Sequence, residues 1–349
     1  MAETLVIRAD ANSEIGIGHV TRCLSLAEAW QDRGGRVIFA MAQPLSSLQH
    51  RLRSEGFCVE VLGCVAGDSD SVRTGELCTR AAATWAVIDG NRFGRDYQHV
   101  LKQAGCRVLI LDDYGTTGEY SADIVLNEDL AITPELYMRR QPYTQLLLGP
   151  SYALLRKQFR EQRPQSRVFS RVATRVLVTM GGSDPENVTL AVIHALRQLG
   201  GTHIDVRVIV GCGNTHLQEL RRAAGKLSSR KLEIIRDVAN MAEHMAWAEV
   251  AVVACGVTLW EVIYMGASVI CWPRNQANEE TLAILQEKKI VEALPRNADA
   301  SCIADYLGSL LKSKTRREAM SRRGQDLIDG LGTARVAQLM IKIADSQKN

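Results

Sequence analysis

The chain has 349 residues, a length typical of two domains of about 100–200 residues each. Its 46% hydrophobic and 23% charged residues fall in the range of globular proteins and exclude a largely disordered chain. The 42 basic and 39 acidic residues leave a formal net charge of +3. So small and dispersed a charge argues against nucleic acid as a partner and leaves room for a small anionic ligand.

Nine cysteines are scattered singly along the chain, with no C-x-x-C pair and no zinc-type spacing of cysteine and histidine. We therefore expect reduced thiols in a cytoplasmic protein, with no metal ion and no cofactor. The N-terminus lacks a charged leader, and no apolar run reaches the roughly 18–20 residues of a membrane span. We expect a monomer without a membrane span.

Apolar segments alternate with helical patterns through most of the chain. In the first half, strands are predicted at 5–7, 37–40, 59–62, 85–88 and 108–111. After residues 128–174, where prolines interrupt the pattern, strands are predicted at 176–178, 206–210, 232–235, 250–253 and 269–272. Strands that alternate with helices form a parallel sheet covered on both faces.

The sequence therefore predicts an α/β protein with two Rossmann-like, doubly wound domains. They are expected at 1–150 and, with C-terminal helices, at 175–349, joined by a crossover linker at 151–174. Such sheets bind ligands at the carboxyl ends of their strands. The substrate is accordingly expected in the cleft between the halves, on the loops that join strands to helices.

The first such loop carries two glycines, a histidine and an arginine: Gly16, Gly18, His19 and Arg22. The glycines permit a close backbone approach, and the N-terminus of the following helix attracts an anion such as a diphosphate. The third glycine of a dinucleotide fingerprint is missing, which disfavours a nicotinamide cofactor. His19 is either a general base or a packed histidine, and Arg22 is either a phosphate ligand or a surface charge.

Two loops of the second half have comparable features. Residues 181–183 are Gly-Gly-Ser and lead into a helix, so they either hold a phosphate or sugar or form an ordinary turn. Glu261 lies one turn inside the helix that follows the strand at 250–253. Its carboxylate can accept hydrogen bonds from both hydroxyls of a ribose, although a lone glutamate there is more often a partner of the helix dipole.

Taken together and in order, these loops resemble those of a known enzyme family. The motifs are Gly-Ile-Gly-His-Val-Thr-Arg at 16–22, Met-Gly-Gly-Ser-Asp at 180–184, Gly-Val-Thr-Leu-Trp-Glu at 256–261 and Arg-Asn-Gln at 274–276. They resemble the PseG/SpsG-like family of UDP-sugar hydrolases, which is similar to the MurG-type glycosyltransferases. The resemblance implies a glycosyltransferase-B fold and metal-independent release of UDP from a 2,4-diacetamido-2,4,6-trideoxy hexose, as in pseudaminic acid biosynthesis.

The resemblance also implies a role for each matching residue. His19 is the general base that activates water for attack at the anomeric carbon, with inversion. The diphosphate lies by Gly16, Gly18 and Arg22, and the sugar or phosphate is held by Gly181, Gly182 and Ser183. The phosphates are bound by Gly256 and Thr258, and the ribose by Glu261. The uracil is read by the main chain near Val238, and the hexose is contacted by Asn275 and Gln276.

One position departs from the family pattern. Members often carry Asp-x-Tyr after the fourth strand, whereas this chain has Asn91 two residues after Asp89, so the hexose pocket is expected to differ. The sequence thus predicts hydrolysis of a UDP-linked amino-deoxy hexose in nonulosonic acid or surface polysaccharide biosynthesis. The main alternative is an inverting glycosyltransferase that uses a UDP-sugar donor. Two further alternatives are a nucleotide-sugar binding module without catalysis and a 2-epimerase. If His19 is not the base, Asp89 and Asp113 are the next candidates.

Overall fold

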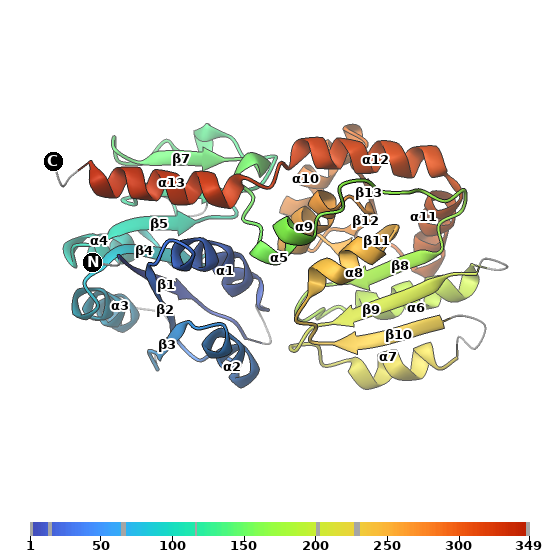
Figure 1. Ribbon diagram of the computed structural model, residues 1–349, viewed down its shortest axis with the longest axis horizontal. Helices are drawn as coiled ribbons and strands as arrows, with labels where there is room; N and C mark the ends of the chain where they lie inside the picture. The colour runs from blue at the N-terminus through green and yellow to red at the C-terminus, as the bar shows by residue number, and fades with distance from the viewer. Residues whose placement is uncertain are drawn as a thin grey trace. The chain divides into compact units, whose positions relative to one another are not determined.

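The computed structural model describes residues 3–12, 16–63, 68–115, 117–199, 203–226 and 231–346, so part of the first predicted loop, at 13–15, lies outside the described residues. The described residues form two compact units. Unit 1 contains the residues up to 12, 17–156 and those from 330 onward, whereas unit 2 contains Gly16 and 157–329. Each unit is an α/β fold (Figure 1).

Unit 1 is built on a seven-stranded sheet in the order β3-β2-β1-β4-β5-β6-β7. Its strands, all paired in parallel, are β1 (Thr4–Ala9), β2 (Arg36–Met41), β3 (Cys58–Val61), β4 (Ala83–Asp89), β5 (Arg107–Leu111), β6 (Ile124–Asn127) and β7 (Gln145–Leu148). The connections include α1 (Gly18–Gln31), α2 (Ser46–Ser54), α3 (Asp68–Arg80), α4 (Arg95–Gln103), and the short 3-10 helices η1 (Pro134–Tyr137) and η2 (Pro150–Tyr152). The five strands predicted for this half are confirmed, and β6 and β7 are additional.

The inner strands β1, β4, β5 and β6 are almost entirely buried and mainly apolar because both faces of the sheet are covered. In β1, Leu5 and Ile7 belong to the core shared with α1 and α2, whereas Val6 belongs to the core on the opposite face, shared with α3 and α4. All three side chains are fully buried. Burial on both faces fixes the register of β1 at the centre of the sheet.

The C-terminal helix α13 (Gly332–Asp345) also belongs to unit 1, whereas the sequence analysis assigned residues 175–349 to the second domain. Val336 and Met340 lie in the same core as α1, and Trp85 Nε1 donates a hydrogen bond to the Met340 carbonyl at 3.2 Å. The apolar face of α13 completes this core. Helical periodicity shows that such a face exists but does not show which sheet it covers.

Unit 2 is built on a six-stranded parallel sheet in the order β10-β9-β8-β11-β12-β13. The strands are β8 (Arg175–Thr179), β9 (Asp205–Val210), β10 (Lys231–Arg236), β11 (Val250–Ala254), β12 (Ser268–Trp272) and β13 (Val291–Ala293). The helices are α5 (Lys157–Gln162), α6 (Val188–Gln198), α7 (Leu217–Ala224), α8 (Met241–Trp247), α9 (Val257–Met265), α10 (Gln276–Glu287), α11 (Ala300–Lys312) and α12 (Lys314–Leu327). The five predicted strands of this half are confirmed, and β13 is an additional edge strand.

Most of the predicted linker packs on unit 2. Arg167 is the main anchor, because its Nη2 and Nε donate to the carbonyls of Met245 and Met265 at 2.7 and 2.8 Å. These carbonyls lie in the last turns of α8 and α9, where helical carbonyls lack partners within the helix. The basic residues of this segment therefore include one that caps helices.

Candidate active site

A histidine and an arginine lie in the first two turns of α1. Between β1 and this helix, Gly16 has a φ of +74°, a left-handed conformation that favours glycine. The helix begins at Gly18, so His19 and Arg22 are three residues apart on one face. Their side chains can therefore act on the same group.

His19 is held by Asp89, the last residue of β4. Its Nδ1 lies 2.6 Å from Oδ1 of Asp89, and the histidine side chain is 21% exposed. Because an ionised carboxylate only accepts hydrogen bonds, we infer that Nδ1 carries a hydrogen and donates it. In the neutral ring Nε2 is then the nitrogen that takes up a proton, as a general base requires.

Arg22 holds Asp89 through a bidentate pair. Its Nε and Nη2 donate to the two carboxylate oxygens of Asp89 at 2.7 and 2.6 Å, and its Nη1 donates to Asp113. The Arg22 side chain is only 9% exposed. We refer to His19, Arg22, Asp89 and Asp113 as the histidine cluster.

The charges of the histidine cluster shift the pKa of its members. The negative charge of Asp89 raises the pKa of His19 above its ordinary 6.5, against the opposing effects of burial and of Arg22. Burial acts to raise the pKa of Asp89, but Arg22 and His19 outweigh it and hold that pKa well below its usual range. Asp89 is therefore ionised at neutral pH and is too weak a base to take a proton from water. Its role is to orient His19 and to stabilise the charged imidazolium.

The partnership of these residues follows from strand order. The sequence analysis named Asp89 and Asp113 only as substitute bases. In the sheet, β1, β4 and β5 are neighbours, so the residues that follow their carboxyl ends meet at one edge. The sequence signal is an aspartate at or just after the ends of two strands, with a histidine and an arginine after another.

A second charged network occupies the position where the sequence departs from the family pattern. Asn91 and Arg92 are exposed in the loop after β4. The Arg92 guanidinium forms an ion pair with Asp10 and lies 5.4 Å from the centre of the Phe93 ring. Asp10 also pairs with the fully buried Arg8 at 2.8 Å. Charged groups and a phenylalanine ring therefore surround this loop, without the tyrosine of the family pattern.

In unit 2, residues 181–183 follow β8, as predicted, but the helix start beyond them is already occupied. α6 begins at Val188, and the carboxylate of Asp184 accepts hydrogen bonds from the backbone N–H groups of Val188 and Thr189 at 2.9 and 3.0 Å. The protein's own carboxylate thus satisfies two N–H groups that could otherwise bind a phosphate.

A glycine pair that the sequence analysis did not single out packs on the same loop. Gly213 N–H donates to the Gly182 carbonyl at 3.0 Å, and a Cβ on Gly211 would lie 2.5 Å from that oxygen. The close approach of two backbones requires glycine at 211. The sequence signal was the Gly-x-Gly at 211–213 directly after a strand.

The remaining predicted residues lie at carboxyl ends of the same sheet. Gly256 directly precedes α9, Thr258 is its second residue, and Glu261 is 2% exposed in the same helix. Because β8 pairs with β11, these residues and 181–183 follow neighbouring strands, at the point where strand order reverses. Val238 follows the edge strand β10, further from this point.

Asn275 and Gln276 follow β12, which neighbours β11. The side chain of Asn275 is the N-cap of α10 and accepts from the Asn278 N–H at 3.0 Å, and Gln276 is the first helical residue. Asn275 therefore has a structural role at this helix start in addition to the sugar contact that the resemblance implies.

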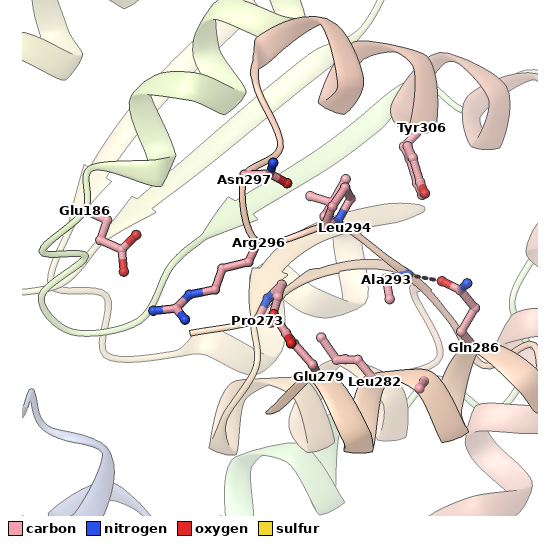
Figure 2. A pocket seen from close by; sticks show the side chains of 12 residues that line it. Glu186, Pro273, Glu279, Leu282, Gln286, Ala293, Leu294, Arg296, Asn297 and Tyr306 are labelled. Carbon is pink, nitrogen blue, oxygen red and sulfur yellow. Dashed lines mark hydrogen bonds between the residues drawn. The ribbon is translucent and has the colours of Figure 1, made fainter. Parts of the chain in front are cut away.

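A pocket of about 750 Å³ lies between α10, α11 and the loop after β13 (Figure 2). Arg296 extends from that loop toward the segment that carries Glu186, and Leu282 and Leu294 provide apolar surface. None of the residues predicted to bind UDP or sugar is among those that line it. The pocket is separate from the residues that carried the sequence-based prediction.

Two further findings concern the described part of the chain. Among residues 3–12, 16–63, 68–115, 117–199, 203–226 and 231–346, no three His, Cys, Asp or Glu side chains are grouped so that they could hold a metal ion. Over the same ranges, every helix is too short or too polar to cross a membrane.

Comparison with protein families relates unit 2 to known sugar-nucleotide enzymes. Residues 175–324 match the glycosyltransferase family 28 C-terminal domain. The chain is 24% identical over 284 residues to the UDP-2,4-diacetamido-2,4,6-trideoxy-beta-L-altropyranose hydrolase of Campylobacter jejuni, covering 79% of this chain and 94% of that protein. It is 26% identical over 239 residues to the spore coat polysaccharide biosynthesis protein SpsG of Bacillus subtilis, covering 67% of this chain and 68% of that one.

A third relative, an uncharacterised protein of Methanocaldococcus jannaschii, is 24% identical over 281 residues, which are 79% of this chain but only 57% of the archaeal protein. Among solved structures, MurG of Acinetobacter baumannii matches with a TM-score of 0.63 at 14% identity, covering 97% of this chain and 99% of that chain. The fold is therefore glycosyltransferase-B, with two parallel α/β sheets, as predicted. The chain is a distant homologue of PseG and SpsG proteins and is related to enzymes that process UDP-sugars.

Proposed function

We propose that the protein hydrolyses a UDP-linked amino-deoxy hexose to free sugar and UDP, with inversion and without a metal ion. The observation that carries the proposal is the contact between His19 Nδ1 and the buried Asp89 at 2.6 Å, which leaves Nε2 as the base. The similarity to the Campylobacter jejuni hydrolase supports the choice of water as acceptor. It also supports a place in nonulosonic acid or surface polysaccharide biosynthesis.

In the proposed reaction, Nε2 of His19 takes a proton from a water molecule while the water oxygen attacks the anomeric carbon. The bond from that carbon to the β-phosphate oxygen breaks on the opposite face, and UDP leaves with the electron pair. Asp89 stabilises the imidazolium that forms, as a buried carboxylate beside a histidine does. Arg22 fixes Asp89 with donors that Asp89 and Asp113 occupy, so the leaving diphosphate would depend on the backbone at Gly16 and Gly18.

We assign the UDP to the loops of unit 2. Glu261 would accept from the ribose hydroxyls, Gly256 and Thr258 would contact the phosphates, and the main chain near Val238 would read the uracil. The sugar would lie by residues 181–183, Asn275 and Gln276. Because Asp184 already caps α6, we expect the phosphate to depend more on the start of α9 than on that of α6.

Glycosyl transfer is the second candidate, because residues 175–324 match a glycosyltransferase domain. A transferase uses the same donor and base but replaces water with an acceptor hydroxyl. The discriminating experiment incubates the protein with a panel of UDP-sugars, with and without candidate acceptors, and measures UDP by chromatography. Release of UDP together with a free sugar of inverted anomeric configuration, in the absence of an acceptor, supports hydrolysis. Release of UDP that requires an acceptor supports transfer.

Metal independence is tested in the same assay. We expect the rate in excess EDTA to stay within about twofold of the untreated rate, because backbone N–H groups at helix N-termini can stabilise the leaving diphosphate. A loss of activity that magnesium or manganese restores would contradict this part of the proposal.

A further inference from the structure

Glu128 is a buried carboxylate of unit 1 that the proposed reaction does not use. It directly follows β6 and is 7% exposed. The charged groups that act on it are Arg22 on α1, Asp113 after β5 and Asp89 at the end of β4. Cys23 on α1 also lies within range of its charge. The charge of Glu128 is therefore coupled to the charges of Arg22, Asp89 and Asp113.

The carboxylate binds the segment by which the chain leaves unit 1. Glu128 Oε1 accepts a hydrogen bond from the Leu154 N–H at 2.9 Å, and the Leu154 carbonyl accepts one from Ser25 Oγ at 3.1 Å. Leu154 is 1% exposed and lies outside any helix or strand. Side chains therefore supply both hydrogen bonds that its buried backbone requires. Ser25 belongs to α1, the helix that carries His19.

The same segment is tied to the point where the chain returns to unit 1. Leu155 N–H donates to Thr333 Oγ1 at 3.1 Å, and that hydroxyl donates to the Leu155 carbonyl at 3.3 Å. A Cβ on Gly332 would lie 2.4 Å from the Ala153 carbonyl oxygen, so the two backbones are in direct contact. The exit at 153–156 and the return at 330–333 thus form one joint inside unit 1, which we call the exit joint.

We propose that Glu128 is a positioning residue: its carboxylate fixes the backbone of Leu154, whose carbonyl holds Ser25 of α1, and it thereby keeps α1, with His19, in its working position. The proposal rests on the proposed function, because its kinetic consequence presumes that His19 is the base. It also extends that function, because it connects the chemistry of unit 1 with the place where unit 2 begins.

The protonation of Glu128 gives this contact a pH dependence. Burial raises the pKa of Glu128 to about 7, although Arg22 acts against it. The neutral acid can still accept from Leu154, but the ionised form makes a charge-assisted hydrogen bond, which is roughly twice as strong. The exit joint should therefore be held more firmly above pH 7 than below it.

The first test compares Glu128→Gln, which keeps an acceptor oxygen but cannot ionise, with Glu128→Leu and with the exposed control Glu135→Gln. We expect Glu128→Leu to lower kcat by about 10- to 100-fold with unchanged UDP affinity, because a displaced base loses its alignment. For Glu128→Gln, the ratio of wild-type to variant kcat should rise about two- to fivefold between pH 6 and 8. A ratio that stays constant over this range would overturn the inference, even if Glu128→Leu fails to fold.

A second measurement is independent of activity. Hydrogen exchange of the Leu154 amide, corrected for its intrinsic rate at each pH, should show protection that rises about two- to fivefold from pH 6 to 8 in the wild type and stays flat in Glu128→Gln. If the wild type releases no UDP but shows this rise, the proposed function fails and the positioning contact stands. Equal pH dependence in both proteins would refute the positioning contact whatever the enzyme does.

Discussion

A histidine acts as an effective general base when its ring is held in one orientation and its other ring nitrogen donates a hydrogen bond. Asp89 orients the His19 ring and accepts the hydrogen bond from Nδ1, and Arg22 in turn holds the carboxylate of Asp89 in place. Replacement of His19 by Asn should therefore lower kcat by about 10²–10⁴-fold, the usual contribution of a general base, while UDP affinity and the melting temperature stay near wild type. His50→Asn, an exposed histidine on α2, is the matched control. Retention of most of the activity would return His19 to a packing role.

The pH dependence of the reaction follows from the same contact. His19 must be neutral to take a proton, and Asp89 raises its pKa above 6.5, so kcat/KM should increase with pH through an ionisation above 6.5. In Asp89→Asn the raising charge is lost while burial and Arg22 still lower the pKa. The acidic limb of the kcat/KM profile should then shift to lower pH by about one pH unit or more, and the maximum kcat/KM should be lower. An unmoved limb, measured beside the exposed control Asp96→Asn, would show that another group limits the rate.

Helix α9 carries the clearest binding prediction of unit 2. A carboxylate at Glu261 can accept from two ribose hydroxyls at once, whereas a glutamine offers one acceptor oxygen. Glu261→Gln should therefore weaken UDP binding by about tenfold in calorimetry. Glu287→Gln, exposed on α10, should leave it unchanged. If both variants bind UDP like the wild type, the ribose contact is misassigned.

Buried strands were readily predicted from the sequence, and the edge strands β3 and β10 were predicted as well, although they are mostly exposed or half-buried. β1 and β11 are buried along their whole length, and both consist mainly of apolar residues. In contrast, the additional strands β6, β7 and β13 have only three or four residues, although β6 and β7 contain the apolar runs 124–126 and 146–148.

For the active site, the sequence located the residues but not their pairing. His19 and Arg22 were found from the loop motif, whereas their bonds to Asp89 join residues about 70 apart. Such pairings depend on strand order, which alternation alone does not specify. Glu128 could not be singled out for the same reason, because its partner is the backbone of a segment far along the chain.

At the level of the whole chain, unit 1 depends on a segment that returns after unit 2. Gly332→Ala should destabilise unit 1 by about 1–3 kcal/mol, because the added Cβ would overlap backbone atoms of Tyr152 and Ala153 that cannot move aside as a flexible side chain can. Gly94→Ala, where nothing lies within 4 Å of the added carbon, should cost only the difference between glycine and alanine at the N-cap of α4, about 0.5–1 kcal/mol. Equal melting temperatures for the two variants would contradict the tight contact.

The return of α13 to unit 1 also has a consequence for biosynthesis. A ribosome releases residues 157–329 before it releases α13, so unit 2 can complete its sheet while the nascent unit 1 still exposes the core around Trp85. The half of the protein with the proposed base then completes its core only after unit 2 has been synthesised. A chain trimmed before Gly332 would keep the sheet assigned to UDP and lose the helix that closes the sheet of His19.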